Sequence, residues 1–212
     1  MEHGPVSDGF ADHGPVSRGS RSSDPRAGKP RIVSPEEFTA HFLEVAKSRE
    51  PAIKAAWSDG PGLTLLALNE KNGLLATVAQ RLNLQCCREY YGIDFVMCEQ
   101  LDTDHFPPTK GWWVAERIGV AIEHENRVWG ATQEMNRLAI YNAPLKVLIT
   151  YPWKEDASGY LAAYAKILER ADTFGDFTSK RRHLVLLASW RSNHVSWESY
   201  VYRRGKFVPL GG

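Results

Sequence analysis

The chain has 212 residues, 43% of them apolar, and its formal net charge at pH 7 is +1. This size and apolar content are typical of one globular domain with a full core. The near-zero charge provides no large basic field, which argues against a free-standing, tight DNA binder. No apolar run approaches the roughly 18 residues of a membrane span, and the N-terminus is polar. We therefore expect a cytoplasmic protein without a membrane partner.

Residues 1–31 are rich in Gly, Pro and Ser and contain a near-repeat that starts at His3 and again at His13. A segment of this composition cannot bury apolar area, so the sequence predicts a disordered tail. Residues 32–212 are then expected to form a single domain.

The domain begins with a helix-start signal. Ser34 is the predicted N-cap, Pro35 occupies the first turn, and Glu37 completes a capping box. Apolar residues at helical spacing follow, and Pro51 is expected to end this helix. Residues 52–57 predict a short helical turn, and residues 70–82 predict a further helix.

Two strands are expected next, over residues 84–91 and 93–98, with Gly92 forming a tight turn between them. Asp94 lies early in the second of these apolar strands. A buried lone carboxylate is costly unless it is paired or bound to a metal. The alternative is an exposed Asp94 on an edge strand.

The three cysteines are Cys86, Cys87 and Cys98. Their odd number and their spacing fit neither a disulfide framework nor a zinc site, so we expect reduced thiols that are mostly buried. The polar segment 99–111 contains His105 beside Asp102 and Asp104 and has the character of a specificity loop.

A strand is predicted over residues 118–125, and it ends in Glu123-His124-Glu125. The period of two assigns Glu123 and Glu125 to one face with Gly119 and Ala121, and His124 to the other face with Ile118, Val120 and Ile122. Two carboxylates this close raise each other's pKa unless a cation lies between them. A divalent metal is the simplest such cation, because it prefers carboxylate oxygens.

The acidic strand opens a strand–helix–strand unit. Residues 128–142 show helical spacing, Pro144 ends that helix, and residues 145–151 form an apolar run typical of a covered strand. This order predicts a right-handed parallel crossover with the acids at the strand end that leads into the helix. A helix over 158–174 and strands over 183–190, 197–202 and 206–210 complete the chain.

This order resembles the restriction-endonuclease-like superfamily, the PD-(D/E)XK nucleases, over roughly residues 70–151. The resemblance implies an α/β fold with an αβββαβ core, in which helices flank a mixed central sheet. An N-terminal helix and C-terminal strands would be additions. It also implies that Asp94 and Glu123 bind metal, with the backbone carbonyl of His124 as an extra ligand.

The sequence departs from the family pattern at the motif lysine, which is replaced by Glu125. Water activation would then fall to the metal or to Glu125 as a base. Lys146, on the neighbouring strand, is an alternative source of the lysine. Glu134 is a candidate catalytic residue that reaches the site from the following helix; Gln133 is the alternative occupant, and Glu134 could instead face solvent.

The expected function is therefore a nuclease that depends on Mg²⁺ or Mn²⁺ and hydrolyses phosphodiester bonds, in DNA first of all. Asp94, Glu123 and Glu125 would hold the metal. The rival hypothesis is a catalytically silent nuclease-fold subunit that acts in nucleic-acid binding or complex assembly. A third is an unrelated α/β domain whose acids form a surface patch. A homodimer or a partner subunit is expected, because the chain shows no recognisable reader of nucleic-acid sequence.

Overall fold

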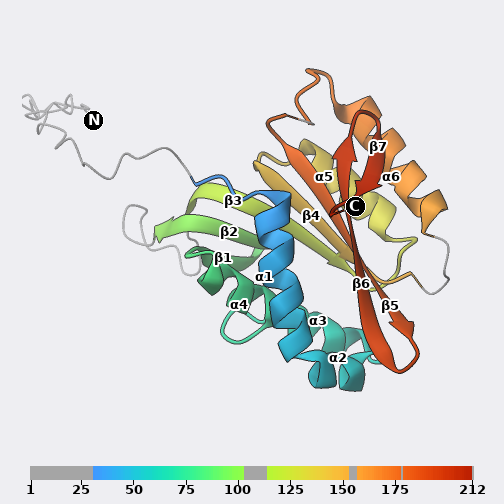
Figure 1. The fold of residues 1–212 in the computed structure, drawn as a ribbon. Coiled ribbons are helices and arrows are strands. Elements are labelled where there is room, and N and C mark those ends of the chain that lie inside the picture. Colours follow the sequence, from blue (N-terminus) through green and yellow to red (C-terminus); the bar gives the residue numbers. More distant parts are fainter. Residues whose placement is uncertain (1–30, 103–113, 153–156, 178, 212) are drawn as a thin grey trace, which may run out of the picture.

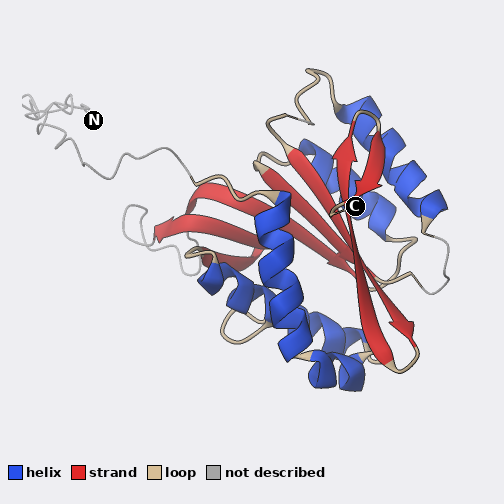
Figure 2. Ribbon diagram, viewed as in Figure 1, coloured by secondary structure: helices blue, strands red, loops and turns tan. Residues whose placement is uncertain are grey.

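The computed structural model of the chain describes residues 31–102, 114–152, 157–177 and 179–211 (Figure 1). Within these residues a seven-stranded sheet is flanked by six helices (Figure 2). The predicted tail over residues 1–31 lies outside the described residues except for Arg31, and so does His105. No helix in the described part of the chain has both the length and the apolarity needed to cross a membrane.

The helices are α1 (Pro35–Ser48), α2 (Glu50–Ala56), α3 (Gly60–Leu68), α4 (Leu74–Arg81), α5 (Ala131–Ile140) and α6 (Ser158–Ala171). The strands are β1 (Gln85–Tyr90), β2 (Ile93–Asp102), β3 (Val114–Glu125), β4 (Leu145–Thr150), β5 (Arg182–Arg191), β6 (His194–Arg203) and β7 (Lys206–Pro209).

The strands lie in the sheet in the order in which they occur in the chain. β1, β2 and β3 are antiparallel, β3, β4 and β5 are parallel, and β5, β6 and β7 are antiparallel. The parallel pairs need crossovers, and α5 and α6 provide them. The predicted α/β class, with a mixed sheet and flanking helices, is confirmed.

Each face of the sheet carries one layer of helices. α1 to α4 pack on one face, against Val120, Val147 and Leu186, and we call this the N-terminal face. α5 and α6 pack on the opposite face, against Ala121 and Leu148, and we call this the crossover face. Every residue of β4 is buried, because both layers cover it. The continuous apolar run from residue 145 onward follows from this double coverage.

Three hairpins are closed by two-residue turns in which both central residues have positive φ. They are Tyr91–Gly92, Ser192–Asn193 and Arg204–Gly205. Positive φ at both positions matches the twist of the paired strands, and glycine or asparagine occupies one position of each turn. The tight turn predicted at Gly92 is confirmed.

The N-cap of α1 is also confirmed, because the Ser34 hydroxyl accepts a hydrogen bond of 3.0 Å from the Glu37 N–H. The second half of the predicted capping box differs. The Glu37 carboxylate accepts a hydrogen bond of 2.6 Å from the Arg31 guanidinium instead. Pro51 does not end the helical region, because α2 begins at Glu50 and places Pro51 in its first turn.

The predicted faces of β3 need one correction, at its amino end. The pairing of β2 with β3 shifts register at Met97 and Cys98, where Gly119 is left without a partner. Ile118 therefore packs on the crossover face, opposite to Val120 and Ile122. A bulge adds one residue and reverses the alternation before it. The faces of residues 120–124 are as predicted.

The N-cap allows a direct stability test. Replacing Ser34 by Ala removes the side-chain acceptor at the start of α1 and should lower the free energy of unfolding by about 1 kcal/mol. Urea denaturation measures the change. Ser34→Asp keeps an acceptor and should retain most of the stability, so equal losses in both variants would contradict the capping role.

Candidate functional site

The structure brings together three of the four predicted catalytic acids. Because β2 pairs with β3, Asp94 lies beside Glu123. The His124 N–H donates a hydrogen bond of 2.9 Å to Asp94 Oδ2, and the Asp94 N–H donates one of 3.4 Å to Glu123 Oε2. β2 has a strand on either side, so the alternative of an edge-strand Asp94 is wrong.

Arg137 on α5 supplies the cation between the acids. Its Nη1 donates to Glu123 Oε1 at 3.0 Å and to Glu134 Oε2 at 2.6 Å. Glu134 is therefore held at the cluster rather than turned to solvent, and its side chain is 15% exposed. Sequence reasoning missed Arg137, although an arginine three residues after Glu134 shares its helix face.

The cluster of Asp94, Glu123, Glu134 and Arg137 is short of positive charge. The Glu123 side chain is fully buried, and burial, together with repulsion from Asp94 and Glu134, raises its pKa to about 9. Arg137 opposes this rise only in part. Burial also raises the pKa of Glu134. Three carboxyl groups beside one guanidinium favour keeping a proton at neutral pH, and burial makes Glu123 the group whose charged form is disfavoured most.

Glu125 lies near enough to the cluster for its charge to add to the rise in the pKa of Glu134, but its hydrogen bond and that of Lys146 are made elsewhere. Glu125 Oε1 accepts a hydrogen bond of 2.8 Å from the Arg127 N–H, across its own turn. The Lys146 amine donates to the Ala139 carbonyl at 3.2 Å and lies over the Phe177 ring, and burial lowers its pKa to about 8. Neither residue forms an ion pair with the cluster among the described residues.

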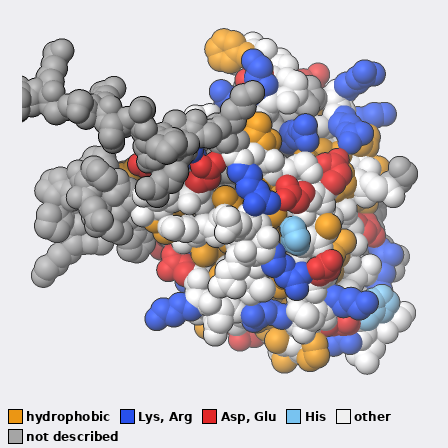
Figure 3. All heavy atoms as spheres, turned by 60° about the vertical axis from the view of Figure 1, so that its left-hand side comes forward, with side chains coloured by type: hydrophobic (Ala, Val, Ile, Leu, Met, Phe, Trp, Pro, Cys, Tyr) orange, Lys and Arg blue, Asp and Glu red, His pale blue; other side chains and the backbone are white. Residues whose placement is uncertain are grey.

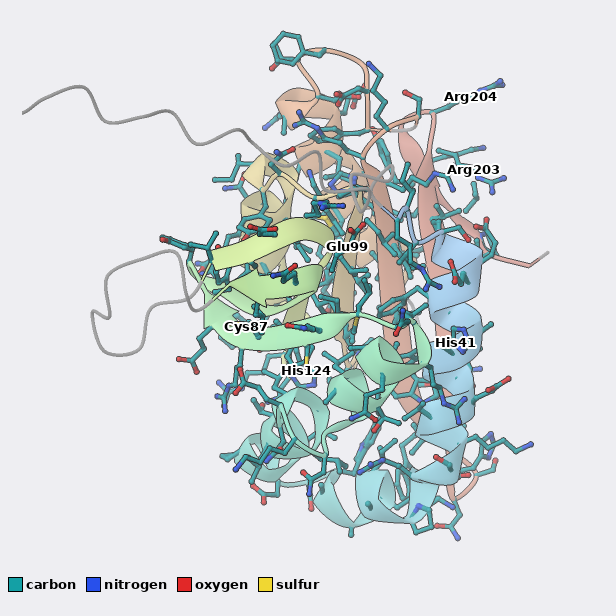
Figure 4. All side chains as sticks on the ribbon, turned by 90° about the vertical axis from the view of Figure 1, so that its left-hand side faces the viewer. His41, Cys87, Glu99, His124, Arg203 and Arg204 are labelled. Carbon is teal, nitrogen blue, oxygen red and sulfur yellow. The ribbon has the colours of Figure 1, made fainter. Side chains whose placement is uncertain are left out.

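His124 points to the N-terminal face, as expected, and its ring makes a separate contact. Nε2 and the Tyr151 hydroxyl are 2.8 Å apart, and both side chains are buried. Burial lowers the pKa of His124 to about 4, so the ring is neutral at physiological pH. Figure 4 shows His124 at the end of the strands, next to the layer formed by the N-terminal helices.

A cavity of about 290 Å³ opens where the parallel strands end, and we call it the edge cavity. Asn126 and Arg127 follow β3, Tyr151 follows β4, and Trp190 lies at the end of β5. Trp57, at the end of α2, forms the opposite wall. The contact that places it is a hydrogen bond of 3.4 Å from the Val195 N–H to Glu50, which holds α2 against β6. In Figure 1 the tips of β5 and β6 lie beside α2 and α3.

Aromatic rings form the walls of the edge cavity. The Trp57 centroid lies 5.5 Å from that of Tyr151 and 5.6 Å from that of Trp190, with an edge-on and a tilted contact respectively. Trp190 is 41% exposed, which is unusual for a large apolar side chain. Leu63 and Leu187 add aliphatic surface. Such walls suit a flat apolar ligand.

The polar atoms of the edge cavity are few and differ in how they are satisfied. Asn126 Nδ2 donates to the Gly60 carbonyl at 3.0 Å and to Thr64 Oγ1 at 2.7 Å, but its Oδ1 is buried without a partner. Arg191 is paired with Glu198 at 3.2 Å. A buried acceptor without a donor is costly, and it marks a place for a ligand N–H or O–H.

Only part of this cavity is signalled by a pattern in the sequence. The predicted crossover places the acids at the carboxyl end of β3. The edge cavity lies at this same end of the parallel strands. Asn126, one residue beyond, and Tyr151 after β4 are the side chains that line the cavity there. Trp57 and Trp190 come from segments far apart in the chain, and no local pattern predicts their contact.

Comparisons with known proteins identify no family. No protein-family model and no curated protein matches the sequence. A solved structure that resembles the chain is the carbon-nitrogen hydrolase of Helicobacter pylori, with 10% identity and a TM-score of 0.34 over 84% of this chain and 81% of the other. A likeness this weak supports no conclusion about fold or activity.

The prediction of a metal-dependent nuclease is wrong. In the described residues no three His, Cys, Asp or Glu side chains are grouped so that they could hold a metal ion. Arg137 fills the cationic role assigned to the metal, and the Glu125 carboxylate is hydrogen-bonded to the Arg127 N–H in its own turn. Basic and acidic side chains are also mixed on the described surface in Figure 3. The hypothesis that the acids form a surface patch is also wrong for Glu123, because its side chain is fully buried.

The raised pKa of Glu123 predicts a pH-dependent stability. Between its ordinary value of 4.5 and about 9, folded Glu123 keeps a proton that the unfolded chain loses. Its contribution is complete below pH 4.5 and declines as the pH rises towards 9. Glu123→Gln keeps a neutral acceptor for Arg137, so the stability of the variant relative to wild type should increase over this range. Thermal melts across the range measure the difference.

Glu116→Gln is the matched control, because Glu116 is exposed on the same strand. It should show no such trend relative to wild type. A difference between Glu123→Gln and wild type that stays constant with pH would contradict a protonated Glu123.

Proposed function

We propose that this chain binds a small, flat, heteroaromatic molecule in the edge cavity. The observation that carries this proposal is a cavity walled by the rings of Trp57, Tyr151 and Trp190, with Asn126, whose buried Oδ1 has no hydrogen-bond partner, among its lining residues. The volume of about 290 Å³ is at the lower end for ligand sites, which favours a ligand of one ring system with a short substituent.

The position of the cavity supports this proposal. In open sheets with parallel strands, ligands bind beyond the carboxyl ends of those strands, where loops from several strands converge. The edge cavity takes residues from the ends of all three parallel strands, β3, β4 and β5. Its walls are also held in place without a ligand, because Tyr151 is hydrogen-bonded to His124 and a hydrogen bond joins α2 to β6. Such preorganisation lowers the entropic cost of binding.

The polar atoms of the edge cavity indicate which hydrogen-bonding group the ligand ring carries. Asn126 Oδ1 needs a donor, so the ligand should present an N–H at the ring edge while its faces contact the aromatic walls. Purine bases and indole derivatives both combine a flat ring with such a donor.

A quaternary ammonium ligand is the other occupant that aromatic walls can favour. The charges of the cavity oppose it. Glu198 is already paired with Arg191, and the Arg127 guanidinium has no carboxylate partner among the described residues. Among the described lining residues the charges therefore sum to a surplus of positive charge, which disfavours a cation.

Other expectations stay predictions. The assignment of residues 70–151 to a restriction-endonuclease-like core rests on the order of elements α4, β1, β2, β3, α5 and β4. Binding of Mg²⁺ or Mn²⁺, a DNA partner, a homodimer or partner subunit and a cytoplasmic location are likewise untested.

Calorimetry with adenosine and with indoleacetamide tests the proposal. Both probes are neutral, flat and carry an N–H donor. At least one should bind the full-length protein at one site. Trp190→Ala removes a stacking surface and should weaken that binding about tenfold or more.

Phe174→Ala is the matched control, because Phe174 is 85% exposed and does not line the cavity. It should leave the affinity unchanged. If neither probe binds, or if Trp190→Ala binds as well as wild type does, the edge cavity is not the site of such a ligand.

A further inference from the structure

A second hollow of about 660 Å³ lies next to the edge cavity, and we call it the outer hollow. Gly60, Asn126 and Arg127 line both spaces, so these residues form the boundary between them. The outer hollow adds Arg88 from β1, Glu125 from the end of β3, and Trp129 from the segment before α5. The long Arg127 side chain is therefore within reach of a group on either side of this boundary.

Arg127 stands at the junction of the two spaces. Its guanidinium carbon lies 5.7 Å from the centre of the Trp129 ring, so the side chain is supported by an aromatic face. No carboxylate lies within ion-pair distance of it among the residues that the structure describes. Stacking leaves the N–H edge of a guanidinium available to an oxyanion.

Arg88 presents a second donor. Its Nε is buried without a hydrogen-bond partner, while its Nη2 pairs with Glu89 at 3.0 Å. The Glu89 side chain is 72% exposed, so this pair contributes little. A buried N–H without an acceptor is costly, and an oxyanion in the outer hollow would relieve it.

Three carboxylates lie near these two guanidinium groups. Glu125 lines the outer hollow, and its Oε1 already accepts a hydrogen bond from the Arg127 backbone N–H. Glu89 pairs with Arg88 from an exposed position, and Glu70 accepts a hydrogen bond of 2.5 Å from the Arg88 backbone N–H. The Arg127 guanidinium and the Arg88 Nε are the donors that these carboxylates leave without a partner among the described residues, and they are of the kind that binds oxyanions.

We propose that the ligand of the edge cavity carries an oxyanion, a phosphate or a carboxylate, which the outer hollow binds through Arg127 and Arg88. This inference rests on the proposed function, because the ring anchors the ligand in the edge cavity. The ligand class is therefore a flat heteroaromatic acid, of which a nucleoside monophosphate and a heteroaromatic carboxylate are the two forms.

Two matched pairs of probes test the oxyanion site by calorimetry on the full-length protein. Adenosine monophosphate is compared with adenosine, and indoleacetate with indoleacetamide. In wild type the charged member of at least one pair should bind about tenfold more tightly than the neutral member, and the advantage should shrink as salt is added. The pair that shows the advantage identifies phosphate or carboxylate as the natural group.

Arg127→Gln should abolish this advantage, measured as the ratio of the affinities of the charged and neutral probes for the same variant. Arg88→Gln should reduce the advantage. Arg204→Gln removes the same charge from the exposed turn between β6 and β7, far from His124 in Figure 4, and should have no effect.

The outcomes separate the two proposals. If the neutral probes bind and their charged partners bind no better, the oxyanion site is wrong and the aromatic site stands. If the advantage survives in Arg127→Gln, the oxyanion is held elsewhere, which also overturns the inference. If no probe of either pair binds, the proposed function itself fails.

Discussion

The parallel pairing of β3, β4 and β5 is the constraint on which the rest of this structure depends. The central strand β4 is buried along its whole length, because α1 to α4 cover one face and α5 and α6 cover the other. Parallel strands require their connections to return across the sheet, so the segments after β3 and β4 both begin at one edge. Asn126, Arg127 and Tyr151 meet there for this reason, although they come from different parts of the chain.

The same pairing explains why the acidic cluster is a buried ion network. The pairing of β2 with β3 brings Asp94 beside Glu123. The crossover helix α5 carries both Glu134 and Arg137, and Arg137 donates hydrogen bonds to Glu123 and to Glu134. A buried carboxyl group without sufficient counter-charge keeps its proton instead of remaining ionised. The cluster therefore links β2, β3 and α5 through hydrogen bonds. The edge cavity lies beyond the strand ends, and its walls come from the loops there and from α2, α3 and β6.

The sequence predicted much of the fold, because most of its elements have local signals. The N-cap at Ser34, the turn at Gly92 and the apolar run of β4 each identify an element without tertiary information. The strand period of two also predicts correctly that Glu123 and Ala121 lie on the same face, which α5 covers. It failed at Ile118, because a bulge at Gly119 reverses the alternation. An isolated glycine within a strand pattern is compatible with a bulge, but the strand period alone takes no account of it.

The site was predicted less well than the fold, for a physical reason. Paired acids near a strand end fit a metal centre and a buried ion network equally, and the difference lies in Arg137, fourteen residues further along the chain. The edge cavity depends on contacts of longer range. Glu50 and Val195, whose hydrogen bond sets the wall that contains Trp57, are 145 residues apart. Pattern analysis cannot supply such contacts.

The central claim is that a flat heteroaromatic ligand occupies the edge cavity. The most direct measurement is a set of NMR spectra that follows the assigned indole N–H signals of the tryptophans while adenosine monophosphate or indoleacetate is added. The account predicts that the signals of Trp57 and Trp190 shift together to saturation. Saturation without shifts at Trp57 and Trp190 would place the ligand elsewhere and contradict the account.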